Sequence, residues 1–456
     1  MPYVLNTPQD QADMLAAIGI SSLDELFDMV PADLRLDRAL NIPAAMSEME
    51  LTSHMQSLSS RTQSADDTVC FLGGGSYDHF IPAVVDYVSS RGEFYTSYTP
   101  YQAEASQGNL QAFFEYQTLI TQLTGMDVSN ASLYDGGSSA AEAVLMCIGA
   151  TRRNGKVVIP ACVHPEYRQI VETFLTNLDV KLEVLETPDG LIRPDELAAA
   201  IDETTACVLL QQPNFFGSVQ EMKELVEVVH KAGALAVVSV DPISLGLLTP
   251  PGSYDADIVV AEGQALGTPM GFGGPYLGIM ACKDEFVRRM PGRLAGQTVD
   301  RRGKRCWALT LQTREQHIRR ERATSNICTN QGLFALRASV YLAQMGPQGL
   351  REVANLCLQK SRHAAAAITA NDRFTLAFDA STFKEFVIRD AAGDVDSLVK
   401  HAMSKGYFAG VPLGQWYPDL SDCFLVAVTE RRTKAEIEGL AECLAAAPAK
   451  ADVVKS

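Results

Sequence analysis

The sequence predicts an α/β protein with a mainly parallel sheet, followed by a smaller α+β part. Two observations lead to this prediction. Between residues 156 and 282, short apolar runs alternate with helical patterns. Strands buried on both faces have such continuous apolar runs, and parallel neighbours need a crossover helix. After about residue 335 the pattern changes to one long helix, followed by alternating strands and helices.

Length and composition limit the class of protein. With 456 residues, 47% apolar and 20% charged, the chain is globular and long enough for more than one domain. We predict an N-terminal helical arm over 1–65, a large α/β domain over 66–335 and a small C-terminal α+β domain over 336–456. No apolar run approaches the roughly 20 residues that span a bilayer. Because the first basic residue is Arg35, we expect no targeting segment and a cytoplasmic protein.

Charge is unevenly distributed. The net charge of −17 argues against nucleic acid as a partner. From Arg288 to Arg322, however, eleven Lys or Arg face three Asp or Glu, a net charge of +8. This segment is either a solvated face or an anion site or docking surface for an acidic partner.

The arm should contain two helices. Thr7–Pro8 opens the first and Gly19 ends it, while Ser22 caps a second that Pro31 breaks. So short an arm has too little core to stand alone. We therefore expect it to pack on the body or on a partner subunit.

Residues 70 to 108 combine glycine with tyrosine. Gly73 to Gly75 precede a loop in which Tyr95, Tyr98 and Tyr101 recur every third residue among Thr, Ser and Pro. Tyrosine suits places where a ligand meets water. A ligand site and a structural loop held by tyrosine hydrogen bonds are both open.

A second small-residue turn opens a helix. After a helix from Gln107 to Gly125, the run Gly136, Gly137, Ser138 and Ser139 leads into another helical pattern. Free N–H groups and the helix dipole at such a turn favour an anion such as phosphate. Many helices begin with Gly and Ser, so the turn alone does not establish a site.

Polar residues follow three strands of the predicted sheet. The expected strands are 156–161, 180–187, 205–213, 235–242, 256–263 and 276–281. His164 follows the first, Asp241 the fourth and Gln264 the fifth. The carboxyl ends of parallel strands border one crevice, so these side chains should converge. We expect the loop that carries Gln264 to be exposed. No lysine occurs between Lys231 and Lys283, so this loop has none.

The ten cysteines occur singly, without a CxxC pair. We interpret them as reduced thiols, most of them in the core. Cys162 and His164 have the spacing of two metal ligands but lack a matching second pair, so we expect no metal site.

Together these features follow the plan of a fold type I pyridoxal-phosphate enzyme of the aspartate-aminotransferase type. The glycine turn at Gly136 can hold a phosphate, His164 can stack on a ring, and Asp241 can pair with a pyridine nitrogen. The loop after the next strand normally supplies a Schiff-base lysine. Here that loop has none.

Long stretches then show a family resemblance. They are FLGGGSYDHFIP, EFYTSYTPYQAEASQG, GMDVSNASLYDG, YDGGSSAAEA and TLQTREQHIRRERATSNICTNQ, in which Arg322 replaces the family's lysine. The chain resembles the P-protein of the glycine cleavage system, glycine dehydrogenase (decarboxylating). It is most similar to the N-terminal half, which is subunit 1 where the enzyme is split in two.

The resemblance implies a fold and a division of work. Subunit 2 would carry the lysine-bound pyridoxal phosphate, and subunit 1 would hold a degenerate copy of the site in an α2β2 heterotetramer. The family's lysine lies five residues before a proline, which is the position of Gln264 relative to Pro269 here. The reaction implied is decarboxylation of glycine, with the aminomethyl group passing to the lipoyl arm of the H-protein.

Subunit 1 would then close one wall of the partner's site. Arg319 or Arg320 could bind an anion bidentately, and His317 could donate or position a proton. Two alternatives stay open: that each is an ion-paired or interface residue, and that the residues of the degenerate site only stabilise the fold. The wall candidates are Tyr95, Tyr98, Tyr101, Arg314, His317, Arg319, Arg320, Thr324, Ser325 and Asn326.

Two other functions are open. A purely structural or regulatory subunit would have no residue in the working site. A self-sufficient pyridoxal-phosphate enzyme would need a displaced lysine, such as Lys283 or Lys304.

Overall fold

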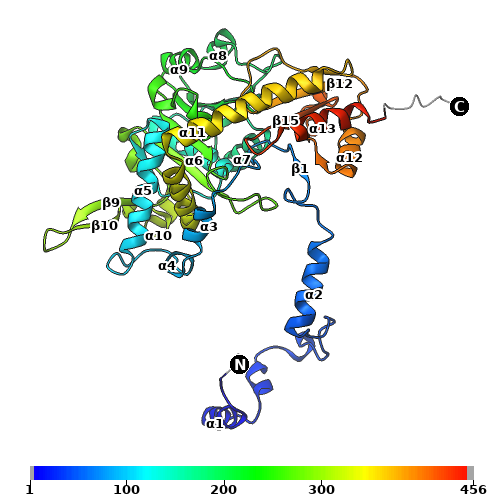
Figure 1. Ribbon diagram of the computed structural model, residues 1–456. Helices are drawn as coiled ribbons and strands as arrows, with labels where there is room; N and C mark the ends of the chain where they lie inside the picture. The colour runs from blue at the N-terminus through cyan, green and yellow to red at the C-terminus, as the bar shows by residue number, and fades with distance from the viewer. Residues whose placement is uncertain (1–4, 449–456) are drawn as a thin grey trace. The chain divides into compact units, whose positions relative to one another are not determined.

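The computed structural model describes residues 5–448 (Figure 1) and forms two units, 5–63 and 64–448. The first unit contains α1 (Pro8–Ile18), the 3₁₀ turns η1 (Leu23–Phe27) and η2 (Ala32–Leu34), and α2 (Glu48–Ser59). No residue of these elements is buried, so the unit has no core of its own.

The ends of the first arm helix are as predicted. The Thr7 side chain accepts a hydrogen bond from the Asp10 N–H, and Gly19 takes a left-handed conformation with φ 87°. The second predicted arm helix is wrong in kind, because it is a 3₁₀ turn that ends at Phe27. Pro31 disfavours helical backbone in the residue before it, which leaves little length for an α-helix.

The second unit is built on a seven-stranded sheet. Six strands are parallel and β8 runs antiparallel between β7 and β2. All six predicted strands are present, and β2 is an addition. The order across the sheet is β2 (Val128–Ser129), β8 (Gly278–Cys282), β7 (Ile258–Glu262), β6 (Leu235–Val240), β5 (Thr205–Gln212), β3 (Lys156–Pro160) and β4 (Lys181–Leu185).

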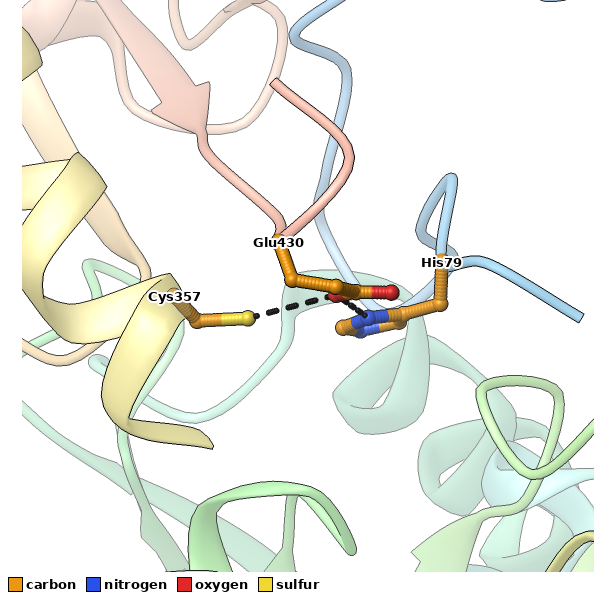
Figure 2. A group of neighbouring side chains, drawn as sticks. All are labelled: His79, Cys357 and Glu430. Carbon is orange, nitrogen blue, oxygen red and sulfur yellow. Dashed lines mark hydrogen bonds and ion pairs between the residues drawn. The ribbon is translucent and has the colours of Figure 1, made fainter. Parts of the chain in front are cut away.

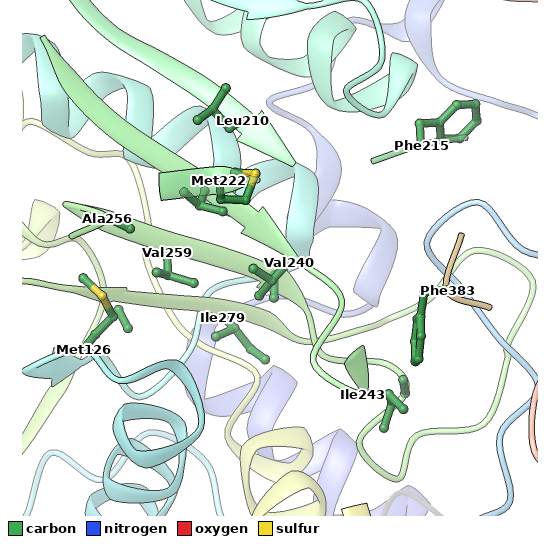
Figure 3. Packing of buried hydrophobic residues seen from close by; sticks show 14 of the residues in the cluster. Met126, Leu210, Phe215, Met222, Val240, Ile243, Ala256, Val259, Ile279 and Phe383 are labelled. Atoms are coloured by element: carbon green, nitrogen blue, oxygen red, sulfur yellow. The ribbon is translucent and has the colours of Figure 1, made fainter. Parts of the chain in front are cut away.

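Alternate residues of each strand enter two separate cores. Leu210 and Val240 lie in one (Figure 3), and Leu209 and Val237 lie in the other. Successive side chains point to opposite faces of a strand, so continuous apolar runs fill both sides. The covering helices are α5 (Gln107–Thr124), α8 (Pro194–Ala200) and α9 (Met222–Lys231) on the first face, and α6 (Gly136–Thr151) and α7 (Pro165–Leu175) on the second.

A long helix joins the sheet to the C-terminal part. It is α11 (Gly332–Thr369), which breaks at Gly346, just before Pro347. Residues Ala335 to Cys357 of this helix pack in the first core, whereas Ala364 and Ile368 enter a third. The boundary that we place after residue 335 lies within this helix and stays a prediction.

The third core belongs to a four-stranded antiparallel sheet. Its order is β11 (Phe374–Leu376), β12 (Glu385–Asp390), β15 (Cys423–Ala427) and β14 (Val411–Pro412), covered by α12 (Val395–Ser404) and α13 (Lys434–Ala445). A separate pair, β1 (Val69–Cys70) and β13 (Tyr407–Phe408), ties the residues that follow the arm to this part.

The remaining elements are short. They are α3 (Ala83–Ser89), α4 (Gly92–Tyr95), η3 (Ser244–Gly246), η4 (Pro251–Tyr254), η5 (Asp284–Arg289), β9 (Leu294–Val299), β10 (Arg305–Thr310), η6 (Gln312–Arg314), α10 (Gln316–Arg319), η7 (Arg320–Arg322) and η8 (Pro418–Leu420). Within the basic segment, β9 and β10 form an antiparallel hairpin that the sequence did not lead us to expect. Among the helices of residues 5–448, none has a stretch long and apolar enough to cross a bilayer.

The third core should be sensitive to truncation. Phe424 is fully buried beside Phe71 and Leu440, so Phe424→Ala should lower the free energy of unfolding by about 3–5 kcal/mol. Leu376→Ala alters an exposed residue of the same sheet and should cost less than about 1 kcal/mol. Urea denaturation measures both, and equal losses would contradict this placement of the core.

Candidate functional site

The three polar residues at the strand ends lie where the sequence places them. His164 follows β3 and caps α7, Asp241 follows β6, and Gln264 lies two residues after β7. Each side chain is already engaged by groups of this chain. The partners of each define what the crevice can hold.

Gln264 is buried, with an exposed fraction of 1%. The expectation that its part of the loop is exposed is therefore wrong, and the exposed residues begin only at Pro269. Its amide Nε2 donates to the carbonyls of Thr268 (2.7 Å) and Tyr77 (3.1 Å), and its Oε1 accepts from the Tyr77 N–H (2.9 Å). The side chain ties two loops together and has no free N–H to offer.

The glycine turn does begin a helix, and a carboxylate already lies at its first N–H group. Gly136 N–H, the first of α6, donates to Glu262 Oε2 (2.9 Å). Asp135 caps Ser138 N–H (2.7 Å), and its carbonyl accepts the Ser139 hydroxyl (2.8 Å). The anion site that the turn predicts is thus occupied by side chains of the protein itself.

Burial raises the pKa of Glu262 to about 7, although N–H groups of Gly136, Leu277 and Gln264 stabilise its charged form. A Cβ atom at Gly136 would collide with Glu262 and with the Tyr167 hydroxyl. Only glycine lets these groups approach the helix so closely.

His164 has an aromatic ring on its face. The ring of Tyr167 stacks on it at 4.5 Å between centroids and 14° between planes, and Phe215 lies edge-on at 4.9 Å. Its Nε2 contacts the Gly74 carbonyl at 2.7 Å. Burial lowers the pKa of His164 to about 4, so the ring is neutral near pH 7.

Asp241 forms a buried ion pair. Lys384, with 1% of its side chain exposed, places Nζ 2.8 Å from the Asp241 carboxylate. The same Nζ lies 3.3 Å from the centroid of the Tyr77 ring and 3.1 Å from His79 Nε2. The positive charge that Asp241 needs is therefore supplied from the C-terminal part of the chain, one residue before β12.

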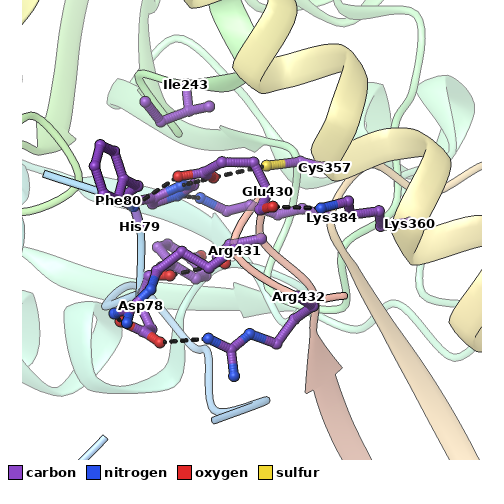
Figure 4. A network of polar contacts seen from close by, with 12 residues as sticks. Asp78, His79, Phe80, Ile243, Cys357, Lys360, Lys384, Glu430, Arg431 and Arg432 are labelled. Atoms are coloured by element: carbon purple, nitrogen blue, oxygen red, sulfur yellow. Dashed lines mark hydrogen bonds and ion pairs between the residues drawn. The ribbon is translucent and has the colours of Figure 1, made fainter. Parts of the chain in front are cut away.

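A polar network extends from this pair (Figure 4). His79 Nδ1 lies 2.7 Å from Glu430 Oε2, and Glu430 also accepts the Phe80 N–H. Burial alone would raise the pKa of Glu430, but the contact with His79 holds it near 2. Asp78 pairs with both Arg431 and Arg432.

Within this network, His79, Cys357 and Glu430 group three types of metal ligand (Figure 2). Two features oppose a cation there. The Lys384 ammonium contacts His79, and burial raises the pKa of the Cys357 thiol, which keeps it protonated. We interpret the group as a structural contact between the segment after the glycine loop, α11 and the loop after β15.

Glu385 connects the glycine loop to the same network. Its carboxylate accepts hydrogen bonds from the Gly74 N–H (2.7 Å) and the Tyr77 hydroxyl (2.8 Å). Burial raises the pKa of Glu385 to about 7, and these two hydrogen bonds oppose the shift. Gly74 in turn contacts His164, so one chain of contacts runs from Gln264 through Tyr77 and Glu385 to His164.

The tyrosines of the candidate wall lie on the surface. Tyr95, Tyr98 and Tyr101 are 67%, 84% and 57% exposed. Tyr101 lies edge-on to His317 (5.8 Å) and over the guanidinium of Arg293 (5.6 Å). Two of the proposed wall segments therefore meet at Tyr101.

The other wall candidates follow the hairpin. Arg314 is half-buried and donates to the Met290 carbonyl, and desolvation lowers its pKa. Arg319 and Arg320 are exposed, and Arg320 has a positive φ of 53°. Thr324 and Asn326 are exposed, whereas the half-buried Ser325 accepts the Ile327 N–H.

The two alternative lysines lie away from the crevice. Lys283 follows β8, which runs antiparallel to β7, and pairs with Asp257 (2.6 Å) at the amino end of β7. Gln264 lies beyond the opposite end of that strand. Lys304 lies in the exposed turn between β9 and β10.

Sequence reasoning missed most of the groups that fill the crevice. They are Tyr77, Tyr167, Glu262, Lys384 and Glu385. Glu262 could have been predicted, since a carboxylate at a strand end beside Gln264 is unusual. Lys384 could not, because its contact with Asp241 joins residues 143 positions apart.

The comparisons with known proteins agree on one family. The profile of the family described as "Glycine cleavage system P-protein" matches residues 1–444. "Probable glycine dehydrogenase (decarboxylating) subunit 1" of Desulforamulus reducens is 48% identical over 446 residues, covering 98% of this chain and 100% of that protein. The protein of the same name from Geotalea uraniireducens is 49% identical over 445 residues, covering 97% and 99%.

Solved structures confirm the predicted aspartate-aminotransferase-like fold. An inhibitor-bound glycine decarboxylase (P-protein) of the glycine cleavage system is 38% identical, with a TM-score of 0.89 over 98% of this chain and 99% of that chain. Lactobacillus brevis glutamate decarboxylase, 12% identical with a TM-score of 0.69, covers 93% of this chain and 96% of its own and shares the fold alone.

The raised pKa of Glu385 predicts a pH effect. Native Glu385 keeps its proton up to about pH 7, whereas the unfolded chain releases it near 4.5. Stability from this group therefore falls as pH rises from about 4.5 to 7. As pH rises from 5 to 8, the free energy of unfolding of Glu385→Gln should increase by about 1–3 kcal/mol relative to that of the parent protein. Urea denaturation at each pH measures this difference.

The matched control is Glu203→Gln, which makes the same change of charge at an exposed position. Its stability should follow the parent curve across this range. If the free energies of unfolding of the parent and of Glu385→Gln changed in parallel with pH, the pKa of Glu385 would not be raised in the native protein.

Proposed function

Because this chain belongs to the glycine cleavage system P-protein family, we propose that it serves glycine decarboxylation as the subunit without a Schiff-base lysine. Relatives that match nearly its whole length are named subunit 1 of glycine dehydrogenase (decarboxylating), and that name implies a second subunit. The observation that carries the proposal is the buried Gln264 amide, which is fully engaged by backbone groups.

The residues of this chain do not fit pyridoxal phosphate. A glutamine cannot form an imine with an aldehyde. Glu262 lies at the helix N-terminus that would hold a phosphate, and Tyr167 covers the ring of His164. Lys384 pairs with Asp241, which would otherwise face a pyridine nitrogen. In this proposal, Gly136, Gly137, Ser138, Ser139, His164, Asp241 and Gln264 form a degenerate site with a structural role.

The cofactor would then belong to subunit 2, where it supplies the electron sink for decarboxylation. The complete enzyme would pass the aminomethyl group of glycine to the lipoyl arm of the H-protein. An α2β2 assembly of two related subunits and a cytoplasmic location complete the proposal. The basic hairpin around Arg302 suits an encounter with an acidic partner, because such charges steer association.

The exposed wall candidates would line the partner's site. Tyr98 and Arg320 have no hydrogen bond or ion pair through their side chains within residues 5–448. Exposed hydroxyl and guanidinium groups of this kind are free to bind the carboxylate of glycine or to exclude water. This observation favours a working subunit over a purely structural one.

A reconstitution experiment tests the division of work. The purified chain with added pyridoxal phosphate should show no borohydride-trappable aldimine and no glycine–bicarbonate exchange, whereas addition of subunit 2 should produce exchange. A trapped aldimine on the lone chain would instead support a self-sufficient enzyme that uses a displaced lysine.

Two substitutions separate the working from the structural subunit. Tyr98→Phe and Arg320→Ala should each lower the reconstituted exchange rate about tenfold, because a lost hydrogen bond to a charged group costs about 1.5 kcal/mol. Tyr87→Phe, at another exposed tyrosine, should leave the rate unchanged. Parent-like rates for Tyr98→Phe and Arg320→Ala would favour the structural role.

A further inference from the structure

Arg293 is a buried arginine that contacts only neutral groups. It is 1% exposed. Its Nη1 donates to Thr329 Oγ1 and Asn330 Oδ1 (both 2.9 Å), and its Nη2 donates to the Cys328 carbonyl (3.2 Å) and contacts the Tyr101 hydroxyl at 3.5 Å. Its Nε is buried without a partner.

No carboxylate compensates this charge within residues 5–448. Other deeply buried cations of the chain have one: Arg432 pairs with Asp78 at 3.0 Å and Lys384 with Asp241 at 2.8 Å. An uncompensated buried guanidinium is costly, whereas an oxyanion beside it would remove that cost. Arginine is also the side chain best suited to bind carboxylate or phosphate.

A pocket of about 260 Å³ is lined by residues of α4, α5 and the start of α11, and by Thr329 and Asn330, the two side chains that accept from Arg293 Nη1. None of its lining residues is charged. Its polar lining consists of Ser97, Thr99, Asn109, Thr329, Asn330 and Gln331. Tyr95 and Tyr98 form part of the remaining wall.

The contacts of Arg293 reach this pocket through Thr329 and Asn330. Because Thr329 Oγ1 accepts from Arg293, its own O–H is free to donate to a group in the pocket. Gln331, Gly332 and Leu333 line the same space at the beginning of α11, where no side chain caps the helix. Its first N–H groups add to the positive potential.

We propose that this pocket binds a small oxyanion, either a carboxylate or a phosphate group. Thr329 donates a hydrogen bond to it, and Arg293 is the positioning residue that supplies the opposite charge. The site deepens the role of Tyr95 and Tyr98 and in that respect rests on the proposed function. Its test uses the full chain alone, so failure would leave the reconstitution result standing.

Equilibrium dialysis of radiolabelled inorganic phosphate, and separately of radiolabelled glycine, tests the site. We expect saturable binding of one anion per chain. Binding of phosphate alone would identify a phosphoryl site, binding of glycine alone a carboxylate site, and mutual competition a general oxyanion site. Absence of saturable binding to both would overturn the proposal and favour a carboxylate of a partner subunit as the counter-ion.

Two variants locate the binding. Arg293→Gln should weaken it at least about tenfold, since the positive charge behind Thr329 and Asn330 is lost. Thr329→Val keeps the arginine and the side-chain shape, and should weaken binding about threefold to tenfold. Arg351→Gln, an equal change of charge at an exposed position of α11, should bind as the parent does. Parent-like affinity in Thr329→Val and Arg293→Gln would overturn the assignment.

Discussion

The buried ion pair between Asp241 and Lys384 joins the two halves of the second unit. Asp241 directly follows β6 of the large sheet, and Lys384 directly precedes β12 of the small sheet. Neither charge is tolerable alone in that position, since an unpaired buried charge costs about 3–5 kcal/mol. The same ammonium contacts Tyr77 and His79, so the glycine loop depends on the pair as well.

Around this pair, each position that a cofactor would use is satisfied from within the chain. The first N–H of α6 has Glu262, the ring of His164 has Tyr167, and the loop after β7 has a glutamine instead of a lysine. The raised pKa of Glu262 and Glu385, both about 7, indicates how dry the region is. The crevice is thus lined by side chains that already bond to one another.

Much of the fold could be predicted from local signals. Continuous apolar runs such as 205–213 identify strands buried on both faces, and Gly19 and Gly125 mark helix ends through left-handed backbone. The hairpin β9–β10 was missed because its arginines and Gly303 resemble a solvated loop. Within the site, His164, Asp241 and Gln264 could be placed because strand ends converge, whereas Lys384 could not, since only tertiary packing brings it there.

The internal satisfaction of the crevice restricts how the sequence can change. Replacing Gln264 by lysine would leave the Tyr77 N–H without its acceptor, and Glu262 and Tyr167 would still occupy their positions. Removing Lys384 alone would leave the buried carboxylate of Asp241 without its counter-ion. Each of these two substitutions therefore leaves a buried group without its partner and lowers stability. Because both positions contact Tyr77, their effects should not be additive.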